Sequence, residues 1–98
     1  MIVERGIWHI KLGCMDQAIE LAKAEMAKLE HPPKWRAYTP QFGGTGDVFV
    51  WEMEFESLAK LEEFWASWYA NPENEEFWKK YNQIAESGGN LEIWNLID

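Results

Sequence analysis

The sequence predicts an α+β fold in which helices cover one face of a four-stranded antiparallel sheet. Apolar residues alternate with a period of two in four segments, and recur every three or four residues in the segments between them. The order is strand, helix, strand, strand, interrupted helix, strand, which is the βαββαβ order of the ferredoxin-like fold. Because 98 residues suit a single domain, residues 1–98 are expected to form one.

The first strand is predicted over residues 2–12, where apolar residues alternate. One face of this strand is mainly apolar, and the other carries Val3, Arg5, Ile7, His9 and Lys11. After a break at Gly13, the spacing changes and predicts a helix over about 14–29. This helix is expected to end before the prolines at 32 and 33, since proline disfavours helical geometry in the residue before it.

Residues 34–42 and 48–55 are predicted as the second and third strands. Three glycines between them, in the segment GGTGD (43–47), indicate a hairpin turn. Pro40 places the second strand at a sheet edge, because proline cannot donate a ladder hydrogen bond. In the ferredoxin-like order, the first and third strands are then the two central ones.

The third strand has one apolar face and one mixed face. Phe49, Trp51, Met53 and Phe55 are expected to face the helices, and the second face carries Val48, Val50, Glu52 and Glu54. A sheet face that mixes apolar and charged residues is usually covered. The expected cover is a second copy of the same sheet, which gives a homodimer with a barrel-like interior.

Ser57 is a suitable N-cap for a second helix, whose apolar stripe includes Leu61, Phe64, Trp65 and Trp68. A break at Asn71-Pro72 is expected to cap and start a third helix with Glu73 and Glu75 in its first turn. SGGN (87–90) is expected to end that helix, and residues 91–97 alternate as the fourth strand.

Composition excludes several classes of function. Seventeen acidic residues against nine basic ones give a net charge of −8, which disfavours nucleic acid and anionic membranes as partners. No apolar run is long enough to cross a bilayer, and the start of the chain lacks a signal-peptide pattern. With Cys14 as the single cysteine, no internal disulfide forms, so a cytoplasmic location is expected.

The stretch VFVWEMEFESLAKLEEFWASWYANPENEEFWKKYNQI (48–84) resembles the dimeric α/β-barrel superfamily. Within it, the Trp-Glu pair of the third strand, the ESLAKLEEF helix start and the NPE break are similar to NIPSNAP-like proteins and antibiotic-biosynthesis monooxygenase (ABM) domains. The resemblance implies a homodimer. Superfamily members include cofactor-independent monooxygenases, haem-degrading enzymes, isomerases and dehydratases, so the fold does not choose an activity.

Haem-degrading members of this superfamily use a histidine near the end of the second helix as the iron ligand. Here that region reads WYAN (68–71), and no histidine lies between Pro32 and Asp98. We therefore expect neither haem nor another cofactor.

A first candidate site lies on the mixed face and consists of Arg5, His9, Arg36, Tyr38, Glu52 and Glu54. His9 beside the Glu52 carboxylate would form a general acid/base unit, with the remaining four residues as ligand contacts. The alternative is that these side chains form ion pairs within a polar dimer cleft.

Metal binding and a cysteine nucleophile are two further chemistries that the sequence could support. His9 with Glu52 or Glu54 lacks the paired spacing of a metal site, and His31 lies in a loop, so no metal is expected. Cys14 at a helix start favours a thiolate, but no base is identifiable beside it, so it is interpreted as a packing residue.

Trp65 and Trp68 form the second candidate site, an apolar pocket between the second helix and the sheet. The alternative is that this aromatic stripe is simply core. Three functions follow: a homodimer that binds a small apolar or aromatic molecule, a cofactor-independent monooxygenase or isomerase using His9 and Glu52, and a purely structural or interaction dimer.

Overall fold

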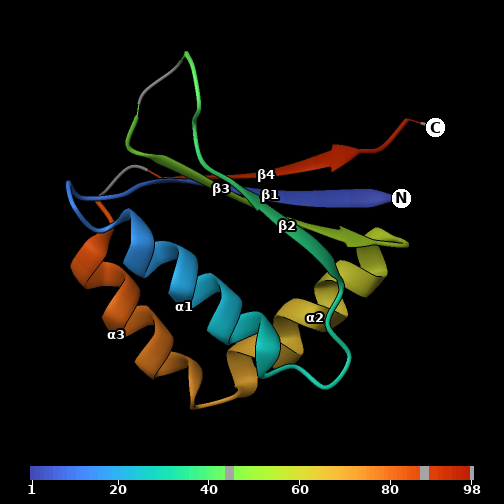
Figure 1. The fold of residues 1–98 in the computed structure, drawn as a ribbon. Helices are drawn as coiled ribbons and strands as arrows, with labels where there is room; N and C mark the ends of the chain where they lie inside the picture. The colour runs from blue at the N-terminus through green and yellow to red at the C-terminus, as the bar shows by residue number, and fades with distance from the viewer. Residues whose placement is uncertain (44–45, 87–88, 98) are drawn as a thin grey trace.

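The structure is a computed structural model, and it describes residues 1–43, 46–86 and 89–97. The predicted α+β element order is confirmed. The elements are β1 (Ile2–His9), α1 (Met15–Ala27), β2 (Lys34–Tyr38), β3 (Val48–Phe55), α2 (Leu58–Ala70), α3 (Asn74–Ile84) and β4 (Asn90–Asn95). All three helices lie on one face of the sheet, and no helix or strand of the described residues covers the other (Figure 1). We call the uncovered side the open face.

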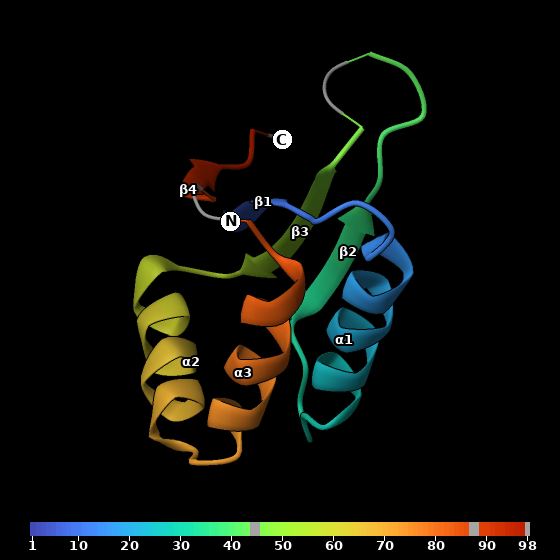
Figure 2. The ribbon, with the colours of Figure 1, turned by 90° about the vertical axis from the view of Figure 1, so that its left-hand side faces the viewer.

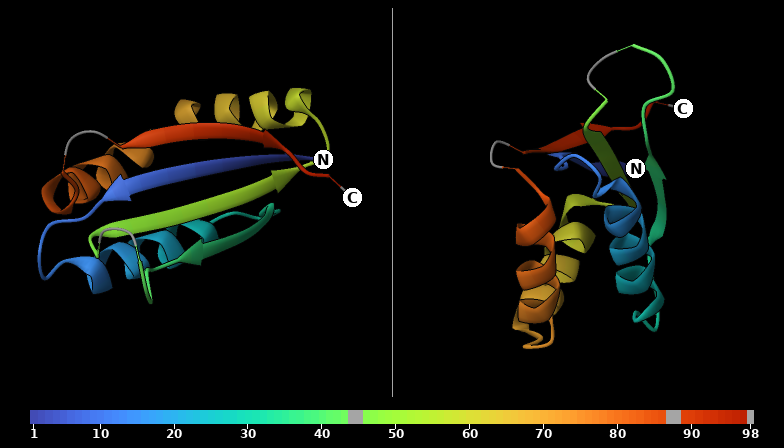
Figure 3. Two further views of the ribbon diagram at one scale, coloured as in Figure 1. Left: turned by 90° about the horizontal axis from the view of Figure 1, so that it is seen from above. Right: turned by 60° about the vertical axis from the view of Figure 1, so that its left-hand side comes forward.

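The sheet is antiparallel with strand order β2-β3-β1-β4, so the predicted central position of β1 and β3 is confirmed (Figure 3). The register aligns one row of charged residues across all four strands, with Arg5 opposite both Glu52 and Glu92, and Arg36 opposite Glu52. Since side chains alternate between the two faces of a strand, all four residues of this row point to the open face.

Several predicted boundaries were wrong by a few residues. β1 ends at His9 instead of residue 12, because Ile10 forms only an isolated bridge to Ala85 and Lys11 donates to the Ile84 carbonyl. β2 ends at Tyr38, short of the predicted residue 42 and before Pro40. α1 spans 15–27 instead of 14–29, and β4 spans 90–95 instead of 91–97. The predicted helix stop at 87–90 lies partly outside the described residues.

The junction between α2 and α3 uses Asn71 differently from the prediction. Ser57 caps α2 as expected, its Oγ accepting from the Lys60 amide at 3.3 Å. The third helix begins at Asn74 rather than Pro72, because residues 71–73 form a turn in which Asn71 Oδ1 accepts from the Glu73 amide at 3.0 Å. The Asn74 side-chain amide donates to the Trp68 carbonyl and so ties the start of α3 to the end of α2.

The core lies between the sheet and the helices. Phe49, which is fully buried on β3, packs with Ala18 and Ala22 of α1 and with Phe77 and Tyr81 of α3. Two alanines on its buried face allow α1 to approach the sheet closely. The three helices lie side by side beneath the sheet (Figure 2). Among the described residues, no helix combines the length and apolar character needed to span a bilayer.

Candidate functional site

A cavity of about 110 Å³ lies between the helix-facing side of the sheet and the helices. Nine of its fourteen described lining residues are aromatic, and of these two come from the sheet, four from α2 and three from α3. They are Trp8, Trp51, Phe64, Trp65, Trp68, Tyr69, Phe77, Trp78 and Tyr81. Both predicted pocket residues, Trp65 and Trp68, are in this set. We call this space the aromatic cavity.

Trp8 reaches the aromatic cavity because two glycines leave room for its ring. A Cβ atom at Gly6 would lie 2.7 Å from Trp8 Nε1, and one at Gly89 would lie 2.5 Å from a ring carbon of Trp8. Both distances are far below ordinary van der Waals contact, so neither position accepts a side chain without movement of Trp8. Edge-on contacts with Trp78 and Tyr81, at 6.4 and 5.5 Å between ring centroids, then fix the indole from the α3 side.

Glu4 places a carboxylate inside this apolar region. It projects from β1 toward the helices, beside Met53 of β3 and Ile93 of β4 in the register, and is 8% exposed. Its Oε2 accepts a hydrogen bond from Trp65 Nε1 at 2.7 Å. Burial raises the pKa of Glu4, and the Trp65 hydrogen bond offsets only part of that effect. Within the described part of the chain, no cationic side chain pairs with Glu4.

Glu25 of α1 is a second carboxylate at the aromatic cavity and is 4% exposed. Its Oε1 accepts from Trp68 Nε1 at 3.1 Å, and its Oε2 lies 3.4 Å from Lys28 Nζ. Each carboxylate is therefore held by one indole of α2, but only Glu25 also has a cationic neighbour.

Two buried donors at the cavity are unsatisfied. Among the described residues, neither Trp51 Nε1 nor the Tyr81 hydroxyl has a hydrogen-bond partner, and Tyr81 is only 2% exposed. Burial raises the pKa of the Tyr81 hydroxyl, so it stays protonated and remains a donor. An unpaired buried polar group costs about 1–3 kcal/mol, which an acceptor on a bound molecule would recover.

An open cleft adjoins the aromatic cavity. It has a volume of about 790 Å³ and lies between the end of α1, the start of β2, the end of β3 and α2. Glu25, Phe64 and Trp68 line both spaces. The other acidic residues of the cleft are Glu30, Glu54, Glu56 and Glu73.

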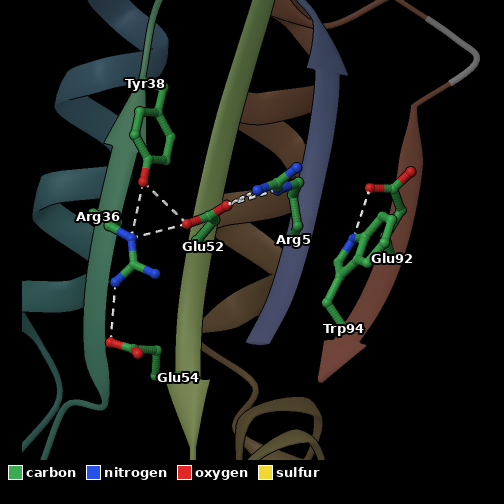
Figure 4. A network of polar contacts seen from close by, with 7 residues as sticks. All are labelled: Arg5, Arg36, Tyr38, Glu52, Glu54, Glu92 and Trp94. Carbon is green, nitrogen blue, oxygen red and sulfur yellow. Dashed lines mark hydrogen bonds and ion pairs between the residues drawn. The ribbon is translucent and has the colours of Figure 1, made fainter. Parts of the chain in front are cut away.

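The open face carries the first candidate site, and the structure brings five of its six residues together (Figure 4). Glu52 is 2% exposed and accepts from Arg5 Nε at 2.6 Å, Arg36 Nε at 2.9 Å and the Tyr38 hydroxyl at 3.1 Å. Arg36 Nη1 also donates to Glu54 Oε2 at 3.0 Å. We call these five residues the Glu52 network.

The electrostatics of the Glu52 network favour its charged form. Burial by itself would raise the pKa of Glu52, but hydrogen bonds from Arg5 and Tyr38 and the charges of the two arginines lower it. The Arg36 hydrogen bond lowers the pKa of Glu54, and the same contact raises that of Arg36. A carboxylate that already accepts hydrogen bonds from two guanidinium groups, and whose pKa is lowered by them, is a poor general base at neutral pH.

His9, the sixth candidate residue, does not join this network. Its Cα partner on β3 is Val48, four residues from Glu52, which is a separation of roughly 13 Å at about 3.3 Å per residue. The His9 Nδ1 atom instead lies 3.0 Å from Asp47 Oδ2. His9 and Glu52 therefore do not form an acid/base pair within one chain, and a catalytic role for either stays a prediction.

His31 and Cys14, the other residues considered for metal binding or nucleophilic chemistry, are not placed beside suitable partner groups among the described residues. His31 and Glu30 are both exposed, with 4.0 Å between their charged groups, and Cys14 is half-buried against the core. In the ranges 1–43, 46–86 and 89–97, no group of three or more His, Cys, Asp or Glu side chains is arranged to hold a metal ion.

Solved structures share this architecture. A NIPSNAP domain protein from Burkholderia xenovorans matches with a TM-score of 0.81 at 14% identity, over 99% of this chain and 95% of that one. A NIPSNAP family protein from Agrobacterium tumefaciens matches with 0.79 at 17%, over 99% and 86%. A protein described as an antibiotic biosynthesis monooxygenase matches with 0.72 at 16%, over the full length of both.

The chain has the fold of these proteins. The predicted resemblance to NIPSNAP-like and ABM-like proteins is thus confirmed at the level of fold. No protein-family model matches the chain, and no curated protein matches its sequence. Because fold does not determine activity, the function must be argued from the residues of the site.

Sequence reasoning missed Glu4 and Glu25. A signal was present for both, since Glu4 occupies a helix-facing position of the first strand and Glu25 falls on the helix face that buries Ala18 and Ala22. A carboxylate at a core position of a period-two or period-3.6 pattern indicates a buried polar group that needs partners.

Proposed function

We propose that this protein binds a small, largely apolar aromatic molecule in the aromatic cavity. The observation that carries the proposal is an aromatic-walled cavity with two lining residues, Trp51 and Tyr81, whose buried Nε1 and hydroxyl donors have no partner among the described residues. Apolar walls with a few polar groups are typical of ligand sites. A core selected only for stability would not retain unsatisfied donors beside a void, because both features cost free energy.

The same proposal includes a homodimer formed through the open face. Trp94 is 52% exposed there, and Tyr38 is also exposed, while Ile7 and Val50 of the central strands are only half-buried. Apolar surface on the uncovered side of a sheet is typical of an interface. The charges on this face are balanced, since Arg5, Lys34 and Arg36 face Glu52, Glu54 and Glu92, so two copies can meet without net repulsion.

An enzymatic function is supported less directly. The ABM-like structure shares the fold, but the predicted acid/base residues His9 and Glu52 are not adjacent within one chain. A monooxygenase or isomerase that uses them stays a prediction, and binding is the function that the geometry supports best.

The test of binding is an NMR titration with benzyl alcohol, which has one aromatic ring and one hydroxyl. We expect saturable shifts in the indole N–H resonances of Trp51, Trp65 and Trp68, which line the aromatic cavity, and none in that of Trp94 on the open face. Shifts that grow linearly without saturation, or that include Trp94 equally, would refute an aromatic ligand site between sheet and helices.

A further inference from the structure

We infer that the ligand of the aromatic cavity is a small organic cation, an ammonium group attached to an apolar body or single ring. This inference rests on the proposed function and adds the charge of the ligand: the ammonium group would lie at Glu4, and the Trp51 N–H and the Tyr81 hydroxyl would meet the ligand's ring, whose π electrons accept weak hydrogen bonds. The ionisable groups that could carry charge in the cavity at neutral pH are Glu4 and Glu25, and among its described lining residues there is no lysine, arginine or histidine. An anionic ligand would meet two carboxylates, since the Lys28 ammonium that pairs with Glu25 does not line the cavity.

Glu4 is the residue with which a ligand cation would form an ion pair. A buried carboxylate is costly unless it is paired with a positive charge or protonated. Glu25 has the Lys28 ammonium at 3.4 Å, whereas the partner of Glu4 is the neutral Trp65 indole. An ammonium ion carries a full positive charge and N–H donors, so it would supply the counter-charge that Glu4 lacks among the described residues.

The aromatic walls favour the same chemistry. Faces of Trp, Tyr and Phe rings attract cations, with Trp the strongest, and the effect grows when the site is desolvated. Trp65 and Trp68 each donate their N–H to a carboxylate, so two of the indoles that line the cavity each hold a carboxylate beside them. Aromatic faces beside fixed carboxylates form a site for an ammonium group rather than for a neutral ring alone.

The cleft beside the cavity has an excess of acidic side chains. The open cleft shares Glu25, Phe64 and Trp68 with the aromatic cavity and contributes four further glutamates against Lys28, Lys60 and His31. Together with a net charge of −8, this excess of carboxylates attracts cations to the cleft beside the cavity and repels anions.

The volume limits the ligand's size. An apolar protein cavity of about 150 Å³ holds one benzene ring. The aromatic cavity, at about 110 Å³, is smaller than that, so one ring or a compact alkylammonium group is the upper limit of size.

Three probes of nearly equal shape and different charge test the inference: benzylammonium, benzyl alcohol and benzoate. Each is titrated into the full chain at about 0.15 M salt, where exposed charges are screened beyond roughly 8 Å, and binding is followed by the indole N–H resonances. We expect benzylammonium to bind at least about tenfold more tightly than benzyl alcohol, and benzoate not to bind. Equal affinity for benzylammonium and benzyl alcohol would overturn the cation and leave the proposed function intact. Absence of saturable binding by all three would overturn both.

A matched pair of variants assigns the preference to Glu4. Glu4→Gln keeps the shape and an acceptor for Trp65 but removes the charge, and should reduce the preference for benzylammonium to less than about threefold. Glu20→Gln, on the exposed side of α1, changes the net charge equally and should leave the preference unchanged. A preference that falls equally in both variants would show a general charge effect and refute the site. The wild-type ranking decides the inference even if Glu4→Gln fails to fold.

Discussion

Trp65 Nε1 lies 2.7 Å from Glu4 Oε2, so a helix residue satisfies a carboxylate on the side of β1 that packs against the helices. This contact joins positions 61 residues apart in the chain. The hydrogen bond from Trp65 stabilises the Glu4 carboxylate in a region where burial disfavours charge. The arrangement makes Glu4 a position where stability and function are expected to conflict.

The pH dependence of stability should report this conflict through Glu4→Gln. The pKa of Glu4 is raised above the ordinary value of 4.5, so its contribution is most favourable below that value and is lost as pH rises through the folded-state pKa. We therefore expect ligand-free Glu4→Gln to gain stability relative to wild type as pH rises from 4 to 7. Urea unfolding at both pH values measures the change, and Glu20→Gln is the control. If the free energy of unfolding of Glu4→Gln instead falls relative to wild type as pH rises, the raised pKa of Glu4 is contradicted.

Trp65→Phe should destabilise the protein in a way that depends on Glu4. It leaves a buried charged acceptor without its donor, at a cost of about 1–3 kcal/mol in unfolding free energy. The cost should be larger at pH 7 than at pH 4, because protonation of Glu4 relieves it. In the background of Glu4→Gln the same substitution should cost less, and a double-mutant cycle isolates the coupling. Additive effects would indicate that Trp65 acts by packing alone.

Two Tyr→Phe substitutions should affect the free energy of unfolding differently: one should not lower it, and the other should. The Tyr81 hydroxyl is buried with no partner in the described part of the chain, so ligand-free Tyr81→Phe should be neutral or stabilising by up to about 1–3 kcal/mol. The Tyr38 hydroxyl accepts from Arg36 and donates to Glu52, so Tyr38→Phe should cost roughly 0.5–1.5 kcal/mol. Both are measured by urea unfolding. A clear loss of stability in Tyr81→Phe would mean that its hydroxyl is satisfied in solution.

Glu52→Gln should remove a stabilising charge and a pH dependence together. The pKa of Glu52 is held below 4.5, so its contribution is present above that value and is lost as pH falls through the folded-state pKa. We expect a loss of roughly 1.5–3 kcal/mol at pH 7, as for hydrogen bonds to charged groups, which shrinks toward acid pH. Glu92→Gln, on the same face but bonded only to Trp94 among the described residues, should change stability by less than about 0.5 kcal/mol. Equal losses in the two variants would argue against a central role for Glu52.

The sequence was sufficient for the Glu52 network because that network depends on local alternation and strand order. Once β1 and β3 pair antiparallel, alternation places Arg5 and Glu52 on one face, and the hairpin brings Arg36 beside them. His9 failed to join because the register, which alternation alone does not fix, sets it opposite Val48.

Glu4 and Glu25 escaped prediction for a different reason. The strand and helix patterns mark both as core positions, but the indole donors that satisfy them lie 61 and 43 residues away, and no local pattern reveals those partners. The start of α3 was displaced for a local reason instead, because Asn71 used its side chain to form a turn before the helix.

The proposed dimer predicts that a charge at the centre of the open face separates the subunits. Val50 lies on β3 opposite Ile7 and Tyr38, so its side chain would be covered by the second copy. Val50→Lys should shift the mass measured by light scattering from dimer to monomer at micromolar concentration, because an unpaired charge buried at an interface is strongly unfavourable. Leu12→Lys, at a fully exposed position between β1 and α1, adds the same charge away from this face and should remain dimeric. A monomeric wild-type protein, or a Val50→Lys variant that stays dimeric, would show that something other than a second copy covers the face.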